Sequence, residues 1–82
     1  MSNYEKYVES FKIAFDIQDV SNIRELEYRG IAEWDSVGHM GLISEIEEAF
    51  NIEMETDDII EFGSFIKGIE LLAKYNVIIE QE

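Results

Sequence analysis

The sequence predicts a small all-α fold, a four-helix bundle of three main helices and a short third helix. Three observations predict it: apolar residues recur at helical spacing, capping residues stand where helices would begin, and no proline interrupts the chain. The length of 82 residues suits a single domain, which we assign to residues 1–82.

The first helix is expected to begin after Ser2 and to end near Ile17. Ser2 and Glu5 have the spacing of a capping box, in which each side chain satisfies a free backbone N–H of the first turn. Ile13 falls on the face opposite the apolar stripe, so it is either half exposed or a partner contact. The stripe itself consists of Tyr4, Tyr7, Val8, Phe11 and Phe15.

Residues 18–35 show no helical period and are predicted to form a long ordered loop, with room for one short helical turn. Gly30 marks a turn within it. Loops of this length are uncommon inside compact domains and usually carry function. The apolar residues expected to anchor it are Val20, Ile23, Leu26, Tyr28 and Ile31.

The second helix is expected to begin at Asp35 or Ser36, both good capping residues, and to run to about Asn51. Gly38 and Gly41 each cost about 1 kcal/mol relative to alanine inside a helix. Something other than helix propensity must therefore hold its first turn. The apolar stripe consists of Leu42, Ile43, Ile46 and Phe50.

Two shorter helices should follow. Thr56 is predicted to cap a helix over residues 57–62, and Gly63 interrupts it. Ser64 can cap the last helix, and residues 77–82 could either prolong that helix or extend irregularly. The inward face of the last helix is predicted to contain Phe65, Ile66, Ile69, Leu72 and Ala73.

The net charge of −13, from six Lys and Arg against nineteen Asp and Glu, restricts the partners. Nucleic-acid backbones and anionic membranes both attract basic proteins, so we expect neither as a partner. No apolar run approaches a membrane span, and no signal-peptide pattern is found, so a cytoplasmic protein is expected. The absence of cysteine excludes disulfides and cysteine-bound metals, and we expect no metal site.

Catalysis is not expected. His39 is the single histidine and stands three residues after Ser36, so a pair of the two would lie on adjacent turns without an evident oxyanion hole. The alternative for His39 is a partly exposed helix residue. Neighbouring carboxylates such as Asp57 and Asp58 do not face each other on a helix, which indicates a solvated acidic surface.

Ser36 remains as the candidate for chemistry. It stands at the expected start of the second helix, between Asp35 and Val37. Free N–H groups and the positive end of the helix dipole favour a phosphate ester on a serine at that place. The other interpretation is that Ser36 or Asp35 is only an N-cap, and the motif taken alone favours it.

In its context, however, this segment resembles the acyl carrier proteins. The similarity consists of Asp35-Ser36-Val37, close to the family's Asp-Ser-Leu motif, and of the acidic helix through Ile46-Glu47-Glu48-Ala49-Phe50. The resemblance extends to length, charge and helix layout, and it is strongest over residues 33–54. It implies a four-helix bundle of the acyl-carrier-protein type.

The resemblance implies that Ser36 receives 4′-phosphopantetheine from coenzyme A through a phosphopantetheinyl transferase. The arm would supply the thiol that the chain lacks and carry an acyl or aminoacyl group as a thioester. The chain would then be a monomeric carrier rather than an enzyme. It would present its cargo to loading, acyltransferase and synthase enzymes of fatty-acid, polysaccharide or specialised-metabolite synthesis.

The resemblance also implies a surface that meets basic patches on these enzymes. Such charge pairing sets encounter rate and orientation and weakens as salt rises, whereas plain solubility is the alternative role for the charges. The predicted recognition residues are Asp35, Val37, Met40, Glu45, Glu47, Glu48, Asp57, Asp58 and Glu61.

In related carriers the space between the helices accepts the acyl chain. Ordinary core packing explains most of the corresponding residues equally well. Gly68 leaves room either for a close helix contact or for a ligand, and His39 would sit at the mouth of the cavity. The predicted lining is Tyr28, His39, Leu42, Ile46, Phe50, Met54, Ile59, Phe62, Ile66, Gly68 and Ile69.

Departures from the family pattern indicate which subclass of carrier the sequence resembles. Val37 replaces the usual leucine, and Trp34 and Gly38-His39-Met40-Gly41 differ from the housekeeping fatty-acid carriers. They look more like stand-alone bacterial carriers, for which a short or polar cargo is possible. The competing hypothesis is an unmodified acidic helical protein-interaction module, which would tolerate the loss of Ser36.

Overall fold

The structure is a computed structural model that describes residues 2–80. Residues 1, 81 and 82, which belong to the predicted domain and in part to the undecided C-terminal segment, lie outside the described residues. Residues 2–80 form four α-helices and one 3₁₀ turn, namely α1 (Asn3–Phe15), η1 (Ile23–Glu25), α2 (Ser36–Phe50), α3 (Thr56–Glu61) and α4 (Phe65–Ala73). The predicted all-α fold with a short third helix is therefore confirmed.

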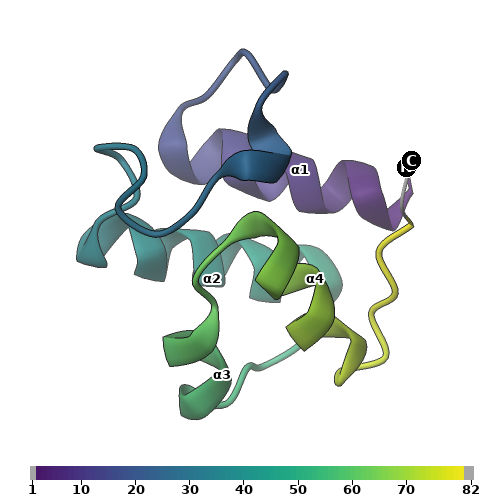
Figure 1. The fold of residues 1–82 in the computed structure, drawn as a ribbon. Coiled ribbons are helices and arrows are strands. Elements are labelled where there is room, and N and C mark those ends of the chain that lie inside the picture. The colour runs from purple at the N-terminus through teal and green to yellow at the C-terminus, as the bar shows by residue number, and fades with distance from the viewer. Residues whose placement is uncertain (1, 81–82) are drawn as a thin grey trace.

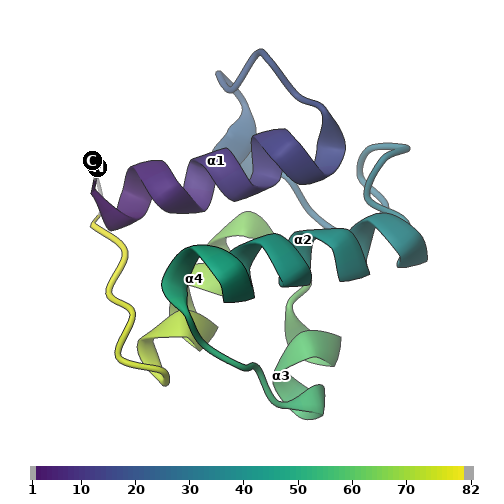
Figure 2. The ribbon, with the colours of Figure 1, turned by 180° about the vertical axis from the view of Figure 1, so that it is seen from behind.

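The helices are arranged around α2. Helices α1 and α2 lie side by side and run in opposite directions (Figures 1 and 2). Helix α4 passes in front of α2 in Figure 1 and behind it in Figure 2, and it contacts α1 through Phe65 and Gly68. The short α3 is the helix farthest from α1 in both views. None of the helices within residues 2–80 is both long and apolar enough to span a lipid bilayer.

Helix α1 begins with the predicted capping box. The Ser2 hydroxyl accepts from the Glu5 N–H at 3.1 Å, and the Glu5 carboxylate accepts from the Ser2 N–H at 2.9 Å. The helix ends at Phe15, where Asp16 turns into the left-handed conformation, two residues before the expected end. Ile13 is 56% exposed, so it faces solvent.

A cluster of aromatic rings forms the core. Phe11 and Phe15 of α1 contact the Trp34 ring, with centroids 5.6 and 5.2 Å away, and Phe11 lies 5.1 Å from Phe65 of α4. Trp34 is fully buried. Each buried side chain of this size contributes about 1.5–3 kcal/mol through the hydrophobic effect, so this cluster is the main source of stability.

The loop before α2 is ordered and fastened to the α3–α4 junction. It contains the expected short helical turn, η1, and its backbone pairs with the junction at two points. The Tyr28 N–H donates to the Gly63 carbonyl at 2.9 Å, and the Phe65 N–H donates to the Leu26 carbonyl at 3.0 Å. These bonds place Tyr28 beside the start of α4.

The first turn of α2 depends on a close approach of the loop. The Asp35 carboxylate accepts from the Gly38 N–H at 2.8 Å, so Asp35 is the N-cap and Ser36 is the first helical residue. A Cβ on Gly38 would lie only 1.9 Å from the Glu33 carbonyl oxygen. Glycine is required there because the loop packs directly on the helix, whereas Gly41 faces open space.

The predicted N-terminal caps of α3 and α4 are confirmed for α4 only. Helix α3 begins at Thr56 with Glu55 in the N-cap position and no capping side chain, so the prediction that Thr56 caps it is wrong by one residue. Ser64 caps α4 as predicted, its hydroxyl accepting from the Lys67 N–H at 2.9 Å.

The inward face of α4 is rotated from the predicted one. Its buried residues are Phe65, Gly68, Leu71 and Leu72. Ile66 and Ala73 are exposed, which corrects their predicted place, and Ile69 is half buried. The face turned this way because Gly68 packs directly on α1 and Phe62. A Cβ on Gly68 would lie 2.2 Å from both the Tyr7 hydroxyl and the Phe62 ring, so this glycine serves a close contact and leaves no space for a ligand.

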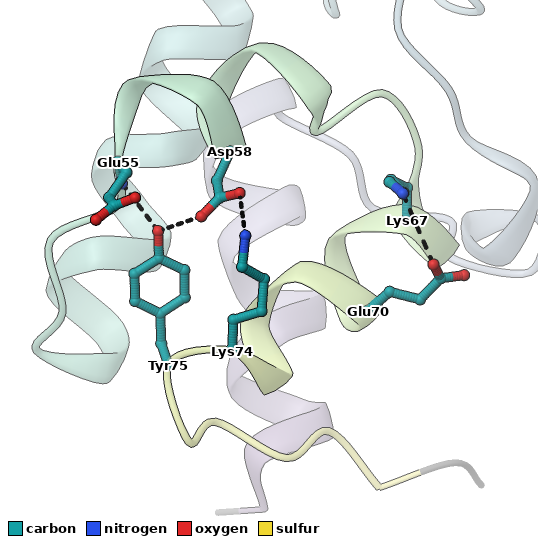
Figure 3. Close-up of polar contacts among 6 residues, drawn as sticks. All are labelled: Glu55, Asp58, Lys67, Glu70, Lys74 and Tyr75. Atoms are coloured by element: carbon teal, nitrogen blue, oxygen red, sulfur yellow. Dashed lines mark hydrogen bonds and ion pairs between the residues drawn. The ribbon is translucent and has the colours of Figure 1, made fainter.

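Helix α3 is held to the end of α4 by a polar cluster (Figure 3). The Lys74 ammonium and the Tyr75 hydroxyl both donate to the buried carboxylate of Asp58, at 2.7 and 2.5 Å. The Glu55 N–H donates to the Tyr75 oxygen at 2.9 Å. The hydrogen bonds from Lys74 and Tyr75 lower the pKa of the Asp58 carboxyl below its usual value. Asp58 is therefore part of the structure and not of an exposed acidic surface.

Residues 77–80 form an extended segment that reaches the first turn of α1 rather than prolonging α4. Val77 and Ile79 are buried and Ile78 is exposed, which is the alternation of an extended segment. The Asn3 side chain donates to the Ile78 carbonyl at 3.0 Å. The Tyr4 N–H donates to the Glu80 carboxylate at 2.9 Å, so the C-terminal segment is tied to the first turn of α1.

Candidate functional site

A groove of about 410 Å³ opens beside Ser36. One side is the first two turns of α2, another is α3, and the loop before α2 and the α3–α4 junction complete it. The groove is lined by Tyr28, Ser36, His39, Met40, Ile59, Ile60, Phe62 and Gly63.

Ser36 presents its hydroxyl at the edge of this groove. The residue is exposed, and its Oγ lies 3.1 Å from the Tyr28 hydroxyl, where either group can donate. The Arg29 guanidinium lies 5.4 Å from the centre of the Tyr28 ring. The hydrogen bond with Ser36 and, to a smaller extent, the interaction with Arg29 lower the pKa of the Tyr28 phenol. Within residues 2–80, Arg29 forms no ion pair with a carboxylate, so its charge is available near Ser36.

His39 uses both ring nitrogens inside the protein. Its Nδ1 accepts from the Trp34 indole at 2.9 Å, and its Nε2 lies 2.8 Å from the Ile59 carbonyl oxygen. An indole N–H only donates and a carbonyl only accepts, so the neutral tautomer with the proton on Nε2 satisfies both contacts. The Ser36 hydroxyl contacts Tyr28 rather than His39.

Large apolar side chains stand exposed around the groove. Val37 is 82% exposed, Met40 is 53% exposed and Ile60 is 74% exposed. Exposed apolar groups gathered beside a groove are typical of a surface that contacts a ligand or a partner. Val37 and Met40 were predicted as recognition residues. Ile60 was not, although the pair Ile59-Ile60 on a short helix means that one of the two must face outward.

Only part of the predicted cavity lining lies at the groove. Tyr28, His39, Ile59 and Phe62 line the groove, and His39 lies at it as expected. The other seven do not, because the aromatic cluster fills the space between the helices. Leu42, Ile46, Met54 and Gly68 are buried in the core, Phe50 and Ile69 are half buried against it, and Ile66 is exposed.

Besides Ile60, sequence reasoning missed three residues of this region. Trp34 was treated only as a departure from a family pattern, yet it is the fully buried partner of His39. Gly63 lines the groove and binds the Tyr28 backbone through its carbonyl. Arg29 adjoins Tyr28 in the loop, and its positive charge, one of six from Lys and Arg against nineteen Asp and Glu, was the signal that could have identified it.

The predicted acidic residues do not form one surface. Asp57 and Glu61 are exposed on α3, which forms one wall of the groove. Glu47 is half buried and accepts from the Met54 N–H at 2.9 Å, so it helps to hold the chain after α2.

Glu45 and Glu48 line a second groove, of about 260 Å³, between α1 and α2. Ile13 lies in the same groove, together with Glu9 of α1. These carboxylates belong to the second half of α2, whereas Ser36 is its first residue.

The residues around Ser36 fit a phosphopantetheine arm. A phosphodiester on the exposed Oγ would lie beside two hydrogen-bond donors, the Tyr28 hydroxyl and the Arg29 guanidinium. The apolar groove begins at the same serine and can receive an attached chain. Comparisons of the sequence and the structure with protein-family models, with curated proteins and with solved structures found no match, so the function is inferred from this site.

Proposed function

We propose that this chain is a carrier protein of the acyl-carrier type, with 4′-phosphopantetheine covalently attached to Ser36. The observation that carries the proposal is an exposed serine hydroxyl at the start of α2 that opens directly onto an apolar groove. The chain contains no cysteine, so a thioester cargo requires a thiol from an attached group.

The attachment is a phosphoryl transfer from coenzyme A. The Ser36 Oγ forms a bond to the phosphorus that bears the pantetheine, and the pyrophosphate P–O bond breaks. Adenosine 3′,5′-bisphosphate leaves with the electron pair, and the serine proton passes to a base of the phosphopantetheinyl transferase. The exposed hydroxyl supports this step because a transferase can reach it.

The neighbours of Ser36 support a role in holding the phosphodiester. The Tyr28 hydroxyl can donate to a phosphate oxygen once Ser36 no longer donates to it. The Arg29 guanidinium supplies a positive charge in a chain with a net charge of −13. Free N–H groups at the start of α2 add a favourable dipole.

The rim of the groove supports contact with partner enzymes. Val37, Met40 and Ile60 provide apolar area, and Asp57 and Glu61 provide negative charge on the adjoining helix. Loading, acyltransferase and synthase enzymes with basic patches would bind here. Because exposed charge pairs are screened, their association should weaken as salt rises.

The test is the intact mass after incubation with coenzyme A, magnesium and a broad-specificity phosphopantetheinyl transferase. We expect one added phosphopantetheine on the wild type and none on Ser36→Ala. Ser44→Ala is the matched control, because Ser44 is an exposed serine on the same helix, and it should be modified normally. An unmodified wild type in the presence of an active transferase would refute the carrier proposal.

A second candidate is an acidic interaction module that carries no prosthetic group. The observation that favours it is the second groove, where the 56% exposed Ile13 lies beside Glu9, Glu45 and Glu48. Lys6 also lines this groove, so three carboxylates and one ammonium group surround Ile13. An apolar group among mostly acidic side chains suits a basic partner protein. This candidate predicts that Ser36→Ala leaves partner binding unchanged and that Ile13→Ser weakens it.

A further inference from the structure

The floor of the groove is made of rings that separate it from the core. His39 and Phe62 line the groove. The His39 ring lies nearly coplanar with the Trp34 ring, with an angle of 16° between the planes, and the two rings meet edge to edge at the hydrogen bond from the indole to His39 Nδ1. Trp34 is fully buried and does not line the groove. A chain attached to Ser36 therefore meets His39 before it can reach the core.

Two hydrogen bonds hold this floor in place. The Trp34 indole donates to His39 Nδ1, and His39 Nε2 donates to the Ile59 carbonyl. They join the loop before α2, α2 itself and α3. Moving the His39 ring aside would break both and leave a buried indole N–H without an acceptor, which is unfavourable.

The core behind this floor is already filled. The gap that Gly68 leaves in α4 is occupied by the Phe62 ring and the Tyr7 hydroxyl, each 2.2 Å from where a Cβ would lie. Leu42 and Ile46, which were predicted to line the cavity, are fully buried in the same cluster. An acyl chain could enter only by displacing several packed side chains.

The groove also offers few polar partners to a cargo. Both His39 nitrogens are used, and the Tyr28 hydroxyl is directed to Ser36. The remaining side chains of the lining are apolar, namely Met40, Ile59, Ile60 and Phe62. The volume of about 410 Å³ lies near the lower end of the range of about 300–1,000 Å³ for small-molecule sites.

We infer that the cargo of this carrier is a short apolar acyl group that lies in the groove beside Ser36, and that His39 limits the length of this group because its ring separates the groove from the core. The inference rests on the proposed function. It favours an apolar acyl cargo over an aminoacyl one, because the side chains that line the groove are apolar apart from Tyr28, Ser36 and His39. His39 acts here as a residue that determines specificity.

The first experiment loads the wild type with a series of straight-chain groups, from acetyl to dodecanoyl. The transferase attaches amide analogues of acyl-coenzyme A, which resist hydrolysis, and the Tm and the methyl NMR shifts of each product are measured. We expect the Tm to rise over the shortest chains and then to stay constant. The methyl signals of Ile59 and Ile60 should shift, and those of Leu42 and Ile46 should not.

Two results would overturn the inference. One is a Tm that keeps rising to dodecanoyl together with shifts at Leu42 and Ile46, which would show the chain inside the core. The other is the absence of any shift at Ile59 and Ile60, which would show that the cargo does not use the groove. If no arm attaches to Ser36 at all, the proposed function itself fails, and the mass spectrum shows this before any cargo is compared.

A matched pair of cargoes tests the preference for an apolar group. Propanoyl and alanyl arms have the same carbon skeleton and differ by one amino group. We expect propanoyl to raise the Tm and to shift Ile59 and Ile60 more than alanyl does. Equal or larger effects of alanyl would contradict the preference.

The role of His39 is tested with the double variant His39→Leu/Trp34→Phe. This change removes both hydrogen bonds of His39 without leaving a buried indole N–H unpaired. We expect acyl chains longer than the wild-type limit to raise the Tm of this variant further. Ser44→Ala is the control, since Ser44 is exposed on the same helix outside the groove and the change keeps both hydrogen bonds, and it should retain the wild-type limit. An unchanged limit in the double variant would refute the role of His39. If that variant does not fold, the methyl shifts of the wild type still decide where the chain lies.

Discussion

Tyr7 and Tyr28 place the same side chain in two very different regions. Tyr7 is fully buried, its hydroxyl donates to the Phe65 carbonyl at 2.6 Å, and Gly68 leaves room for it. Tyr28 is half buried beside a groove, and its hydroxyl meets the exposed Ser36. Burial raises the pKa of the Tyr7 phenol well above its usual value, whereas contacts with Ser36 and Arg29 lower the pKa of the Tyr28 phenol.

The difference separates stability from function. The Tyr7 hydroxyl has a partner inside the protein, and the packing between Tyr7, Phe62 and Gly68 is tight, so changes there should act on folding. Around Tyr28 there is free volume and an exposed hydroxyl, so changes should act on Ser36 and leave the fold intact. Four substitutions test this division, from the largest expected effect to the smallest.

Gly68→Ala should destabilise the buried region around Tyr7. The new Cβ would lie 2.2 Å from both Phe62 and Tyr7, which must move for it to fit. We expect a loss of about 1–3 kcal/mol in the free energy of unfolding, measured by urea denaturation. A neutral effect would show that the region around Tyr7 contains spare volume.

Asp58→Asn should loosen α3, the helix that joins the two regions. The pKa of Asp58 is lowered in the folded protein, so its contribution to stability is present above the unfolded pKa of about 3.9 and is lost as pH falls through the folded value. We expect a lower Tm than the wild type at neutral pH, and a difference that shrinks below about pH 4.

The control for this change is Asp57→Asn, on the same helix but exposed. It should leave the Tm nearly unchanged at every pH. A pH dependence shared by both variants would assign the effect to net charge rather than to the bonds with Lys74 and Tyr75.

Gly41→Ala should stabilise the protein. Gly41 lies on the exposed face of α2 with no atom near its missing Cβ, so alanine restores helix propensity without a clash. We expect a gain of about 0.5–1 kcal/mol in urea denaturation and unchanged modification of Ser36. A loss of stability would mean that this face of α2 is not open.

Tyr28→Phe should have the smallest effect on folding, within about 0.5 kcal/mol. It removes the hydroxyl that touches Ser36 and keeps the ring on His39, whose centroid lies 5.5 Å away. The ³¹P shift of the attached arm should change, because a donor to the phosphate is lost. An unchanged ³¹P shift, or a loss of stability as large as that of Gly68→Ala, would contradict the comparison.

Local signals predicted most of the fold. The capping box of Ser2 and Glu5 and the cap at Ser64 each depend on residues three apart, so they could be read from the sequence. The start of α2 was predicted at Asp35 or Ser36 for the same reason, and the helix begins at Ser36 with Asp35 as its cap. The end of α1 and the cap of α3 were displaced by one or two residues, because tertiary contacts decide where a helix stops.

Features that depend on distant residues could not be predicted. Asp58 looked like a surface charge until the fold brought Lys74 and Tyr75 to it. Trp34 sits in a loop by sequence, yet the fold places it at the centre of the core. For the candidate site, Ser36 and its groove neighbours Tyr28 and His39 were predicted, whereas the filled interior was not, because it depends on how Trp34 and Gly68 pack.

The bonds between the C-terminal segment and α1 have a practical consequence. Asn3 binds Ile78 and Tyr4 binds Glu80, so both described ends of the chain lie at the same end of the molecule. The start of α2 lies at the opposite end (Figures 1 and 2). A tag or linker fused to either end would attach the protein to a sensor surface with its serine pointing away, and fusion on either side should leave that serine equally accessible.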